Sequence, residues 1–253
     1  MEIVSKFFAF LENNLFLKNG TCPICGKVLF ITDHYLCSGC EEELPWINGP
    51  TCEGCGRLVF VTNRPRCKAC AIGNFPFTGG YAWLHYHHSG KALVHAIKFK
   101  NRPNLGIWAG TQMGRELAKI PWVKEIDFIM PVPLHQSRLE DRGYNQSEKI
   151  ARGIVKGLAE SFTESHNKLP LLKLQTLRRS RNTPHQVGQG REERLTNLLG
   201  AFSAEYLEEF QGKTILVVDD VLTTGATLAE VATTLLEAGA KEVYIATVCA
   251  VAE

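Results

Sequence analysis

The last third of the chain shows the clearest alternation of apolar and polar segments. Residues 215–218 are apolar and follow a turn-like Gln-Gly-Lys sequence, which predicts a buried parallel strand. A helix is predicted from about Thr227 to Ala238, because Gly239 stands where helices commonly end. A further apolar run at residues 243–251 places Cys249 in the core. In an open α/β sheet, ligands bind at the carboxyl ends of such strands.

The same kind of pattern continues through the middle of the chain. Residues 127–131 predict a second strand, which ends in a turn between Pro131 and Pro133, and a helix is predicted over residues 147–158. From about Thr78 onward, strand and helix patterns alternate, which is typical of a mainly parallel sheet. We therefore expect an α/β fold over most of the chain.

Acidic, hydroxyl and glycine residues fill the loop between strand 215–218 and the helix after it. Backbone N–H groups, hydroxyls and a helix N-terminus together make a phosphate-binding loop. The two adjacent carboxylates can only accept hydrogen bonds, so they suit sugar hydroxyls or a metal ion. The pattern predicts a sugar-phosphate site made of Asp219, Asp220, Thr223, Thr224, Gly225, Ala226 and Thr227.

Two other interpretations of this loop are weaker. An ordinary strand–turn–helix can end in acids by accident, but two acids, two threonines and a glycine rarely coincide. A P-loop nucleotide hydrolase needs the pattern G-x-x-x-x-G-K-[ST]. The chain lacks it, since Leu207 stands where the glycine upstream of Gly212 and Lys213 is required.

Eight of the nine cysteines lie within residues 22–70, where they form four Cys-x-x-Cys pairs that repeat with a period of 30 residues. Two such pairs supply four thiolates for a tetrahedral metal site. Disulfides are favoured in secreted proteins, redox dithiols occur singly, and zinc is commoner than iron in closed structural sites. We expect two structural zinc ions, with consecutive pairs sharing an ion, and the spacing leaves interleaved pairing open. The expected ligands are Cys22, Cys25, Cys37, Cys40, Cys52, Cys55, Cys67 and Cys70.

Charge and hydropathy limit the cellular setting. The first residues do not form a signal peptide, and no apolar run approaches the ~18 residues of a membrane span. We therefore expect a cytoplasmic protein without a membrane span. The formal net charge is only +2, but the middle of the chain is basic and its end is acidic. A basic middle favours polyphosphate or nucleic acid as a ligand, although a solvated surface can have the same charge.

Two basic segments of the middle region can complete an anion site. Arg138 and Arg142 are four residues apart after the predicted turn, so in a helix they share one face and suit a diphosphate. Residues 177–191 have no apolar periodicity and are rich in cations, amides and glycine, which predicts a mobile loop. Such a loop can close over a bound substrate. The alternatives are a solvated helix face and an exposed basic linker.

These motifs together resemble the ComF family of bacterial competence proteins, and the strand–loop–helix at 215–227 resembles the signature of type I phosphoribosyltransferases. The resemblance implies an N-terminal helical segment (1–19), a double zinc ribbon (20–76) and a phosphoribosyltransferase-like domain (77–253) with a hood at about 79–125 and a core at about 126–253. It implies binding of 5-phosphoribosyl-1-pyrophosphate (PRPP) with Mg²⁺. The pyrophosphate would meet Pro131, Val132, Pro133, Arg138 and Arg142, under a flexible loop with Arg178, Arg179, Arg181, His185 and Gln186.

Two classes of function agree with this resemblance. The protein either handles single-stranded DNA during DNA uptake, together with the uptake machinery, or transfers the phosphoribosyl group to an unidentified base or amine as a metabolic enzyme. For the first class we expect DNA contacts at Lys98, Lys100 and Arg102 and base stacking on nearby aromatic residues, among them Trp83 and Tyr144. We also expect a Cys→Ser change to destabilise the ribbon and spare the 215–227 site.

Overall fold

The computed structural model describes residues 20–29, 34–60, 65–73, 75–162, 168–180 and 200–252. The helical segment expected over residues 1–19 lies outside this range, and so do Arg181, His185 and Gln186 of the expected flexible loop. Among the described helices, none is long and apolar enough to cross a membrane.

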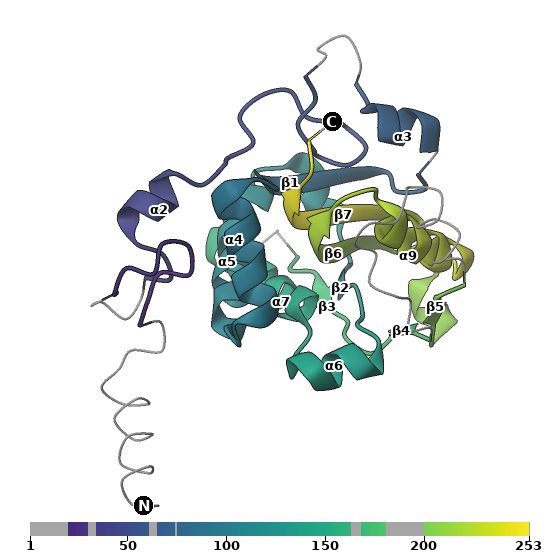
Figure 1. The fold of residues 1–253 in the computed structure, drawn as a ribbon. Helices are drawn as coiled ribbons and strands as arrows, with labels where there is room; N and C mark the ends of the chain where they lie inside the picture. Colours follow the sequence, from purple (N-terminus) through teal and green to yellow (C-terminus); the bar gives the residue numbers. More distant parts are fainter. Residues whose placement is uncertain are drawn as a thin grey trace, which may run out of the picture.

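A five-stranded sheet forms the centre of the molecule (Figure 1). All its neighbouring strands are parallel, which confirms the predicted fold class. In the order in which they pair, the strands are β1 (Gly79–His85), β7 (Glu242–Ala250), β6 (Thr214–Leu222), β2 (Phe128–Pro131) and β3 (Leu171–Leu172). A separate antiparallel pair joins β4 (Leu177–Arg179) to β5 (Phe202–Ala204).

Strand β6 continues four residues beyond the predicted end. Its pairing with β2 stops where Pro131 lies opposite Val218, but its pairing with β7 continues as far as Leu222 and Ala250. The long apolar run of β7 supplies this extra pairing, which the pattern of β6 alone did not reveal. Among the residues that the structure describes, no strand pairs with this side of β6 beyond Val218, and Asp219 lies at the start of that open side.

Helices cover both faces of the sheet (Figure 1). Alternate residues of β6 pack into the cores on opposite faces of the sheet, as expected for a strand that is apolar on both faces. Leu216 and Val218 belong to the core on one face, and Ile215 and Val217 to the core on the other. The first face carries α4 (His88–Phe99), α5 (Pro103–Leu117) and α7 (Gln146–Ser161), and the second carries α9 (Ala226–Glu237). The short helices are η1 (Pro121–Glu125), α6 (Gln136–Arg142) and η2 (Leu207–Phe210).

Helices α5 and α7 cross at very short range because glycines line their contact. A Cβ atom on Gly110 would lie 2.0 Å from the carbonyl oxygen of Ile150, and one on Gly153 would lie 2.1 Å from that of Ile107. Only glycine permits such an approach of two backbones. This packing holds the N-terminal end of α7 next to the open side of β6.

The segment that the resemblance implied to be a hood, about 79–125, contributes to these layers. It supplies β1 to the edge of the central sheet and α4 and α5 to one of its faces.

The two cysteine repeats have the same local structure. Antiparallel bridges pair Thr21 with Val28 and, 30 residues later, Thr51 with Leu58. Each repeat ends in a short helix, α2 (Ser38–Glu42) or α3 (Lys68–Gly73). Their surroundings differ, because the first repeat packs into the core of α4, α5 and α7 and the second into the core of α9.

Candidate functional site

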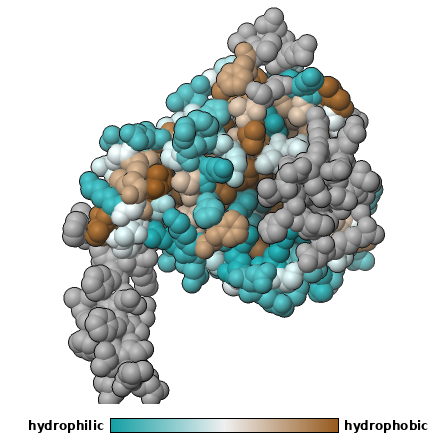
Figure 2. All heavy atoms as spheres, in the orientation of Figure 1, coloured by the Kyte–Doolittle hydropathy of each residue, from teal (hydrophilic) through white to brown (hydrophobic). Residues whose placement is uncertain are grey.

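A cleft of about 420 Å³ opens at the carboxyl ends of β6 and β2. This is the position at which an open α/β sheet binds its ligands. Its lining residues come from segments far apart in the sequence, namely α4, the segment after β2, α6, the start of α7, β4, and the end of β6 with the loop and helix α9 after it. Figure 2 shows a mainly hydrophilic surface over α6, at the bottom of the view. The cleft is therefore a polar site on the rim of an apolar sheet.

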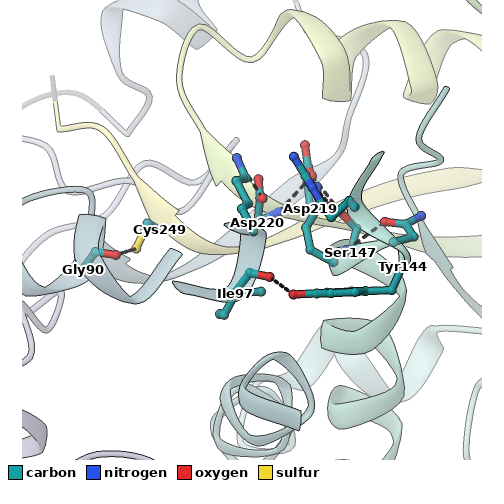
Figure 3. A network of polar contacts seen from close by, with 11 residues as sticks. Gly90, Ile97, Tyr144, Ser147, Asp219, Asp220 and Cys249 are labelled. Carbon is teal, nitrogen blue, oxygen red and sulfur yellow. Dashed lines mark hydrogen bonds and ion pairs between the residues drawn. The ribbon is translucent and has the colours of Figure 1, made fainter. Parts of the chain in front are cut away.

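The acid pair lies at the floor of the cleft, where β6 loses its pairing with β2. Figure 3 shows Asp219 and Asp220 side by side, with Ser147 of α7 directed at Asp219. Oδ1 of Asp219 accepts hydrogen bonds from the Ser147 hydroxyl at 2.9 Å and from the backbone N–H of Asp220 at 2.9 Å. Burial and the neighbouring Asp220 carboxylate outweigh these bonds and raise the pKa of Asp219 to about 7.

Lys98 closes the cleft from the side of α4. Its Nζ lies 2.8 Å from Oδ2 of Asp220, whose side chain is only 4% exposed. Burial opposes the charge of this lysine, but the Asp220 carboxylate prevails and raises the pKa of Lys98. The pair sets a cation directly beside the acids at the bottom of the site.

The predicted phosphate loop follows the acids. Thr223 and Thr227 line the cleft, and Thr224, Gly225 and Ala226 line a small hollow that adjoins it. Gly225 has a φ of +87° and starts α9, so the backbone turns sharply into the helix. The free N–H groups of a helix start favour an anion. The strand, loop and helix lie in the predicted order.

Arginines face the acids across the cleft. Arg138 and Arg142 lie on one helix, α6, and both line the cleft together with Val132 and Pro133. Burial lowers the pKa of Arg142, and the guanidinium lies 5.1 Å from the centre of the Phe99 ring. Cations that are partly removed from water gain from an anionic partner.

The backbone after β2 is held in place by the start of α7. Pro131 ends β2 and is buried, whereas the segment after it forms the wall. The amide of Asn145 donates to the carbonyl of Val132 at 3.0 Å, and Gln146 accepts from Arg142. Residues 145–147 therefore support both the arginine wall and the acid floor.

The expected flexible loop is described only in part. Arg179 lines the cleft, and burial lowers its pKa, with Arg138 adding to the effect. Arg178 pairs instead with Glu205 at 2.8 Å on the surface. Arg181, His185 and Gln186 lie outside the described residues.

The three cations expected to contact DNA have different surroundings in the structure, and their contact with DNA stays a prediction. Lys98 belongs to the cleft, whereas Lys100 and Arg102 donate to the first ribbon. Arg102 bonds the carbonyl of Thr21 at 2.6 Å and Lys100 that of Pro23 at 3.3 Å. These bonds form because the ribbon packs against the junction of α4 and α5.

Two of the aromatic residues that were expected to stack on bases are buried, which corrects that expectation. Trp83 and Tyr144 are 3% and 8% exposed, and the Tyr144 hydroxyl donates to the carbonyl of Ile97 inside the core (Figure 3). An aromatic residue near the cleft that is accessible is Phe99, which is 58% exposed. It lines a second cavity of about 500 Å³ that shares Lys98, Arg138 and Arg142 with the cleft. Cys249 is fully buried, as expected.

The cysteines form two separate tetrads. Consecutive pairs combine, which settles the pairing that the spacing left open: Cys22, Cys25, Cys37 and Cys40 form one group, and Cys52, Cys55, Cys67 and Cys70 the other. Within each group the sulfur atoms lie within 4.8 Å of one another, and no disulfide joins them. Four thiolates in a closed group fit a structural zinc ion.

Three residues of the site had no clear signal in the sequence. Ser147 and Gln146 lie in a segment that reads as an ordinary helix start, and Arg57 follows a cysteine knuckle. Arg57 donates from Nη2 to the carbonyl of Thr223 at 2.9 Å, which brings the second ribbon to the phosphate loop. Contacts over such sequence distances depend on the fold and not on a local motif.

Both parts of the chain match known domain families. Residues 15–71 match a double zinc ribbon domain, and residues 139–253 match a phosphoribosyl transferase domain.

Related proteins carry names that refer to competence and DNA utilization. The chain is 28% identical to Competence protein F of Haemophilus influenzae, over 90% of this chain and 95% of that protein. It is 32% identical to the DNA utilization protein YhgH of Salmonella typhi, over 62% of this chain and 65% of that protein. A solved glutamine PRPP amidotransferase from B. subtilis matches 61% of this chain and 30% of its own, with 22% identity and a TM-score of 0.39. The chain is therefore a homologue of Competence protein F, and it combines a double zinc ribbon domain with a phosphoribosyl transferase domain.

Proposed function

We propose that the cleft binds PRPP together with Mg²⁺. The observation that carries the proposal is the meeting of a carboxylate pair and an arginine wall in one cleft of about 420 Å³. PRPP has ribose hydroxyls that donate hydrogen bonds and phosphate groups that attract cations. Asp219 and Asp220 suit the hydroxyls, and Arg138 and Arg142 suit the pyrophosphate.

The remaining parts of PRPP follow from the same chemistry. The 5′-phosphate belongs in the loop of Thr223–Thr227, where backbone N–H groups and hydroxyls gather at the start of α9. Arg179 adds a third guanidinium for the pyrophosphate. Mg²⁺ commonly binds through one or two carboxylates and substrate phosphates, so the acid pair also fits this ion. When bound, Mg²⁺ would neutralise part of the negative charge of the pyrophosphate.

Transfer of the phosphoribosyl group from PRPP to an acceptor in the cleft needs little from the protein beyond the positioning of the two reactants. The bond between C1 of the ribose and the pyrophosphate oxygen breaks, the electron pair leaves with the pyrophosphate, and an acceptor lone pair forms the new bond to C1. The arginine wall stabilises the departing charge. A metabolic transferase would use the same groups.

We further propose that the protein acts in DNA uptake and handles single strands at this cleft. The relatives named for competence and DNA utilization support the role. Lys98, Arg138, Arg142 and Arg179 line the cleft and attract a phosphodiester backbone. In the adjoining cavity, exposed Phe99 beside Arg142 provides a surface on which a base can stack.

One experiment separates binding from turnover. PRPP and Mg²⁺ are incubated with the protein alone, with free nucleobases, and with single-stranded oligonucleotides, while pyrophosphate release and PRPP binding are both measured. The proposal predicts saturable PRPP binding in every mixture. Release only with nucleobases would favour a metabolic transferase, and absence of PRPP binding would refute the proposed site.

A further inference from the structure

A single buried arginine joins the second cysteine tetrad to the phosphate loop. Arg57 is 5% exposed and follows the knuckle that contains Cys55. Its Nε–H donates to Sγ of Cys55 at 3.3 Å, and its Nη2 donates to the backbone carbonyl of Thr223 at 2.9 Å. A planar guanidinium has a fixed fork of donors, so both bonds constrain one rigid group.

The internal repeat of the ribbon provides a natural comparison. Lys27 stands 30 residues before Arg57, at the same place after the first knuckle, and its side chain is exposed. The first tetrad lies in the core of α4, α5 and α7, on the other face of the sheet from α9. One copy of the repeat therefore presents its cation to solvent, while the other copy directs its cation at the loop before α9.

A second contact joins the same two regions. A Cβ atom on Gly225 would lie 3.0 Å from the ring of Phe75, so the ring packs closely against the loop backbone. Phe75 follows α3, the helix that carries Cys70, and is buried in one core with the second tetrad and α9. The loop is thus supported by the ribbon at Thr223 and again at Gly225.

We propose that the second tetrad, with its metal bound, positions the phosphate loop through Arg57. A zinc ion with four thiolates has a net charge of about −2, which makes the cysteine sulfur a strong acceptor for the guanidinium. Arg57, held there, fixes the Thr223 carbonyl and with it the N–H groups of the loop. Arg57 is a positioning residue, and its effect on PRPP rests on the function proposed above.

If the proposal holds, changes in the second tetrad should affect the 215–227 site, contrary to the expectation that changes in the ribbon spare it. The first tetrad should still spare it, because Arg57 and Phe75 both belong to the second repeat. Binding free energies are also reciprocal, so a ligand on the loop must stabilise the metal in the second tetrad as much as the metal stabilises the ligand.

The test compares Arg57→Lys with Lys27→Ala. Lysine keeps the charge but lacks the fork, so it cannot make both bonds at once. Hydrogen–deuterium exchange without PRPP should be several-fold faster at amides 223–227 in Arg57→Lys and unchanged in Lys27→Ala. PRPP affinity should fall about tenfold in Arg57→Lys alone, the effect of losing one charged hydrogen bond.

Wild-type protein allows a test that needs no substitution. Saturating PRPP with Mg²⁺ should raise the metal affinity of one of the two sites about tenfold, measured by equilibrium competition with a chromogenic chelator, and leave the other site unchanged. Unchanged exchange in Arg57→Lys together with unchanged metal affinity of both sites would overturn the coupling. If wild type does not bind PRPP, the proposed function fails, and the exchange of amides 223–227 in Arg57→Lys still decides the coupling.

Discussion

Nζ of Lys98 lies 2.8 Å from Oδ2 of Asp220, so a cation of α4 pairs with the acid pair near the carboxyl end of β6. The two residues are 122 positions apart in the sequence, and the fold alone brings them together. Asp220 is 3% exposed, and a carboxylate at such a depth depends on a partner. Lys98 therefore both stabilises the cleft and adds to its positive wall.

Replacing Lys98 by Met should lower the free energy of unfolding by about 2 kcal/mol, below the 3–5 kcal/mol of a fully buried pair because Lys98 is 25% exposed. Denaturant titrations of Lys98→Met, Asp220→Asn and the double variant give the coupling energy. Lys91→Met, at an exposed lysine of the same helix outside the cleft, is the control. Additive losses in the double variant would contradict the pair as described.

PRPP binding should release a proton near neutral pH. The pKa of Asp219 is raised from 3.8 to about 7, and ribose hydroxyls need the ionised carboxylate as acceptor. Affinity should therefore rise with pH between about 6 and 8. Calorimetry in buffers of different ionisation enthalpy should report that binding releases close to one proton per PRPP at pH 6 and almost none at pH 8. Asp219→Asn should abolish this contribution, and equal proton release in that variant would refute it.

The same raised pKa predicts how stability depends on pH without ligand. The folded protein holds the Asp219 proton more tightly than the unfolded chain, so this contribution is present below about pH 4 and is lost as the pH rises towards 7. Denaturant titrations across this range should show a steeper decline for wild type than for Asp219→Asn. Parallel curves would mean that the carboxyl group titrates normally.

Protein purified without chelator should contain two zinc ions per chain, one for each tetrad. Cys25→Ser and Cys55→Ser should each remove one ion. Cys55→Ser should lower the melting temperature more, because all four cysteines of its tetrad are buried, whereas Cys25 is exposed. Elemental analysis and thermal unfolding measure both effects. A chain with four disulfides and no zinc would contradict the assignment.

Single-stranded DNA should bind with a strong salt dependence. A plot of the logarithm of the binding constant against the logarithm of the salt concentration should have a slope of about −0.7 per phosphate contact. A 5′-phosphorylated oligonucleotide should compete with PRPP better than the same oligonucleotide with a 5′-hydroxyl, since only the first can occupy the phosphate loop. Fluorescence anisotropy at several salt concentrations tests this. Binding of both oligonucleotides without any effect of PRPP would place DNA on a different surface.

Local patterns sufficed for the parts of the site that are continuous in sequence. The phosphate loop and the helix after it follow the strand in the predicted order, although the strand extends to Leu222 and so includes the acid pair. Arg138 and Arg142 lie together on one helix, the case in which their spacing puts them on one face. The period of the cysteines likewise predicted two tetrads. In these segments the residues that form the site also determine the local backbone conformation.

Residues that reach the site from elsewhere were misassigned or missed. Lys98 resembled an exposed cation because its partner lies on β6, and Arg57 resembled any residue after a knuckle. Ser147 reaches Asp219 only because glycines let α7 approach α5 closely. Such positions are set by the packing of layers, which the periodicity of one segment does not encode.

The affinity of PRPP for wild type and for Asp219→Asn/Asp220→Asn, measured by calorimetry with and without Mg²⁺, tests the proposed PRPP site most directly. Loss of charged hydrogen bonds worth about 1.5–3 kcal/mol each should weaken binding at least a hundredfold. Both proteins should contain equal zinc and be equally folded. Mg²⁺-dependent binding to wild type and none to the variant at micromolar PRPP is the predicted result. Equal affinity of the two proteins would contradict the placement of PRPP in this cleft.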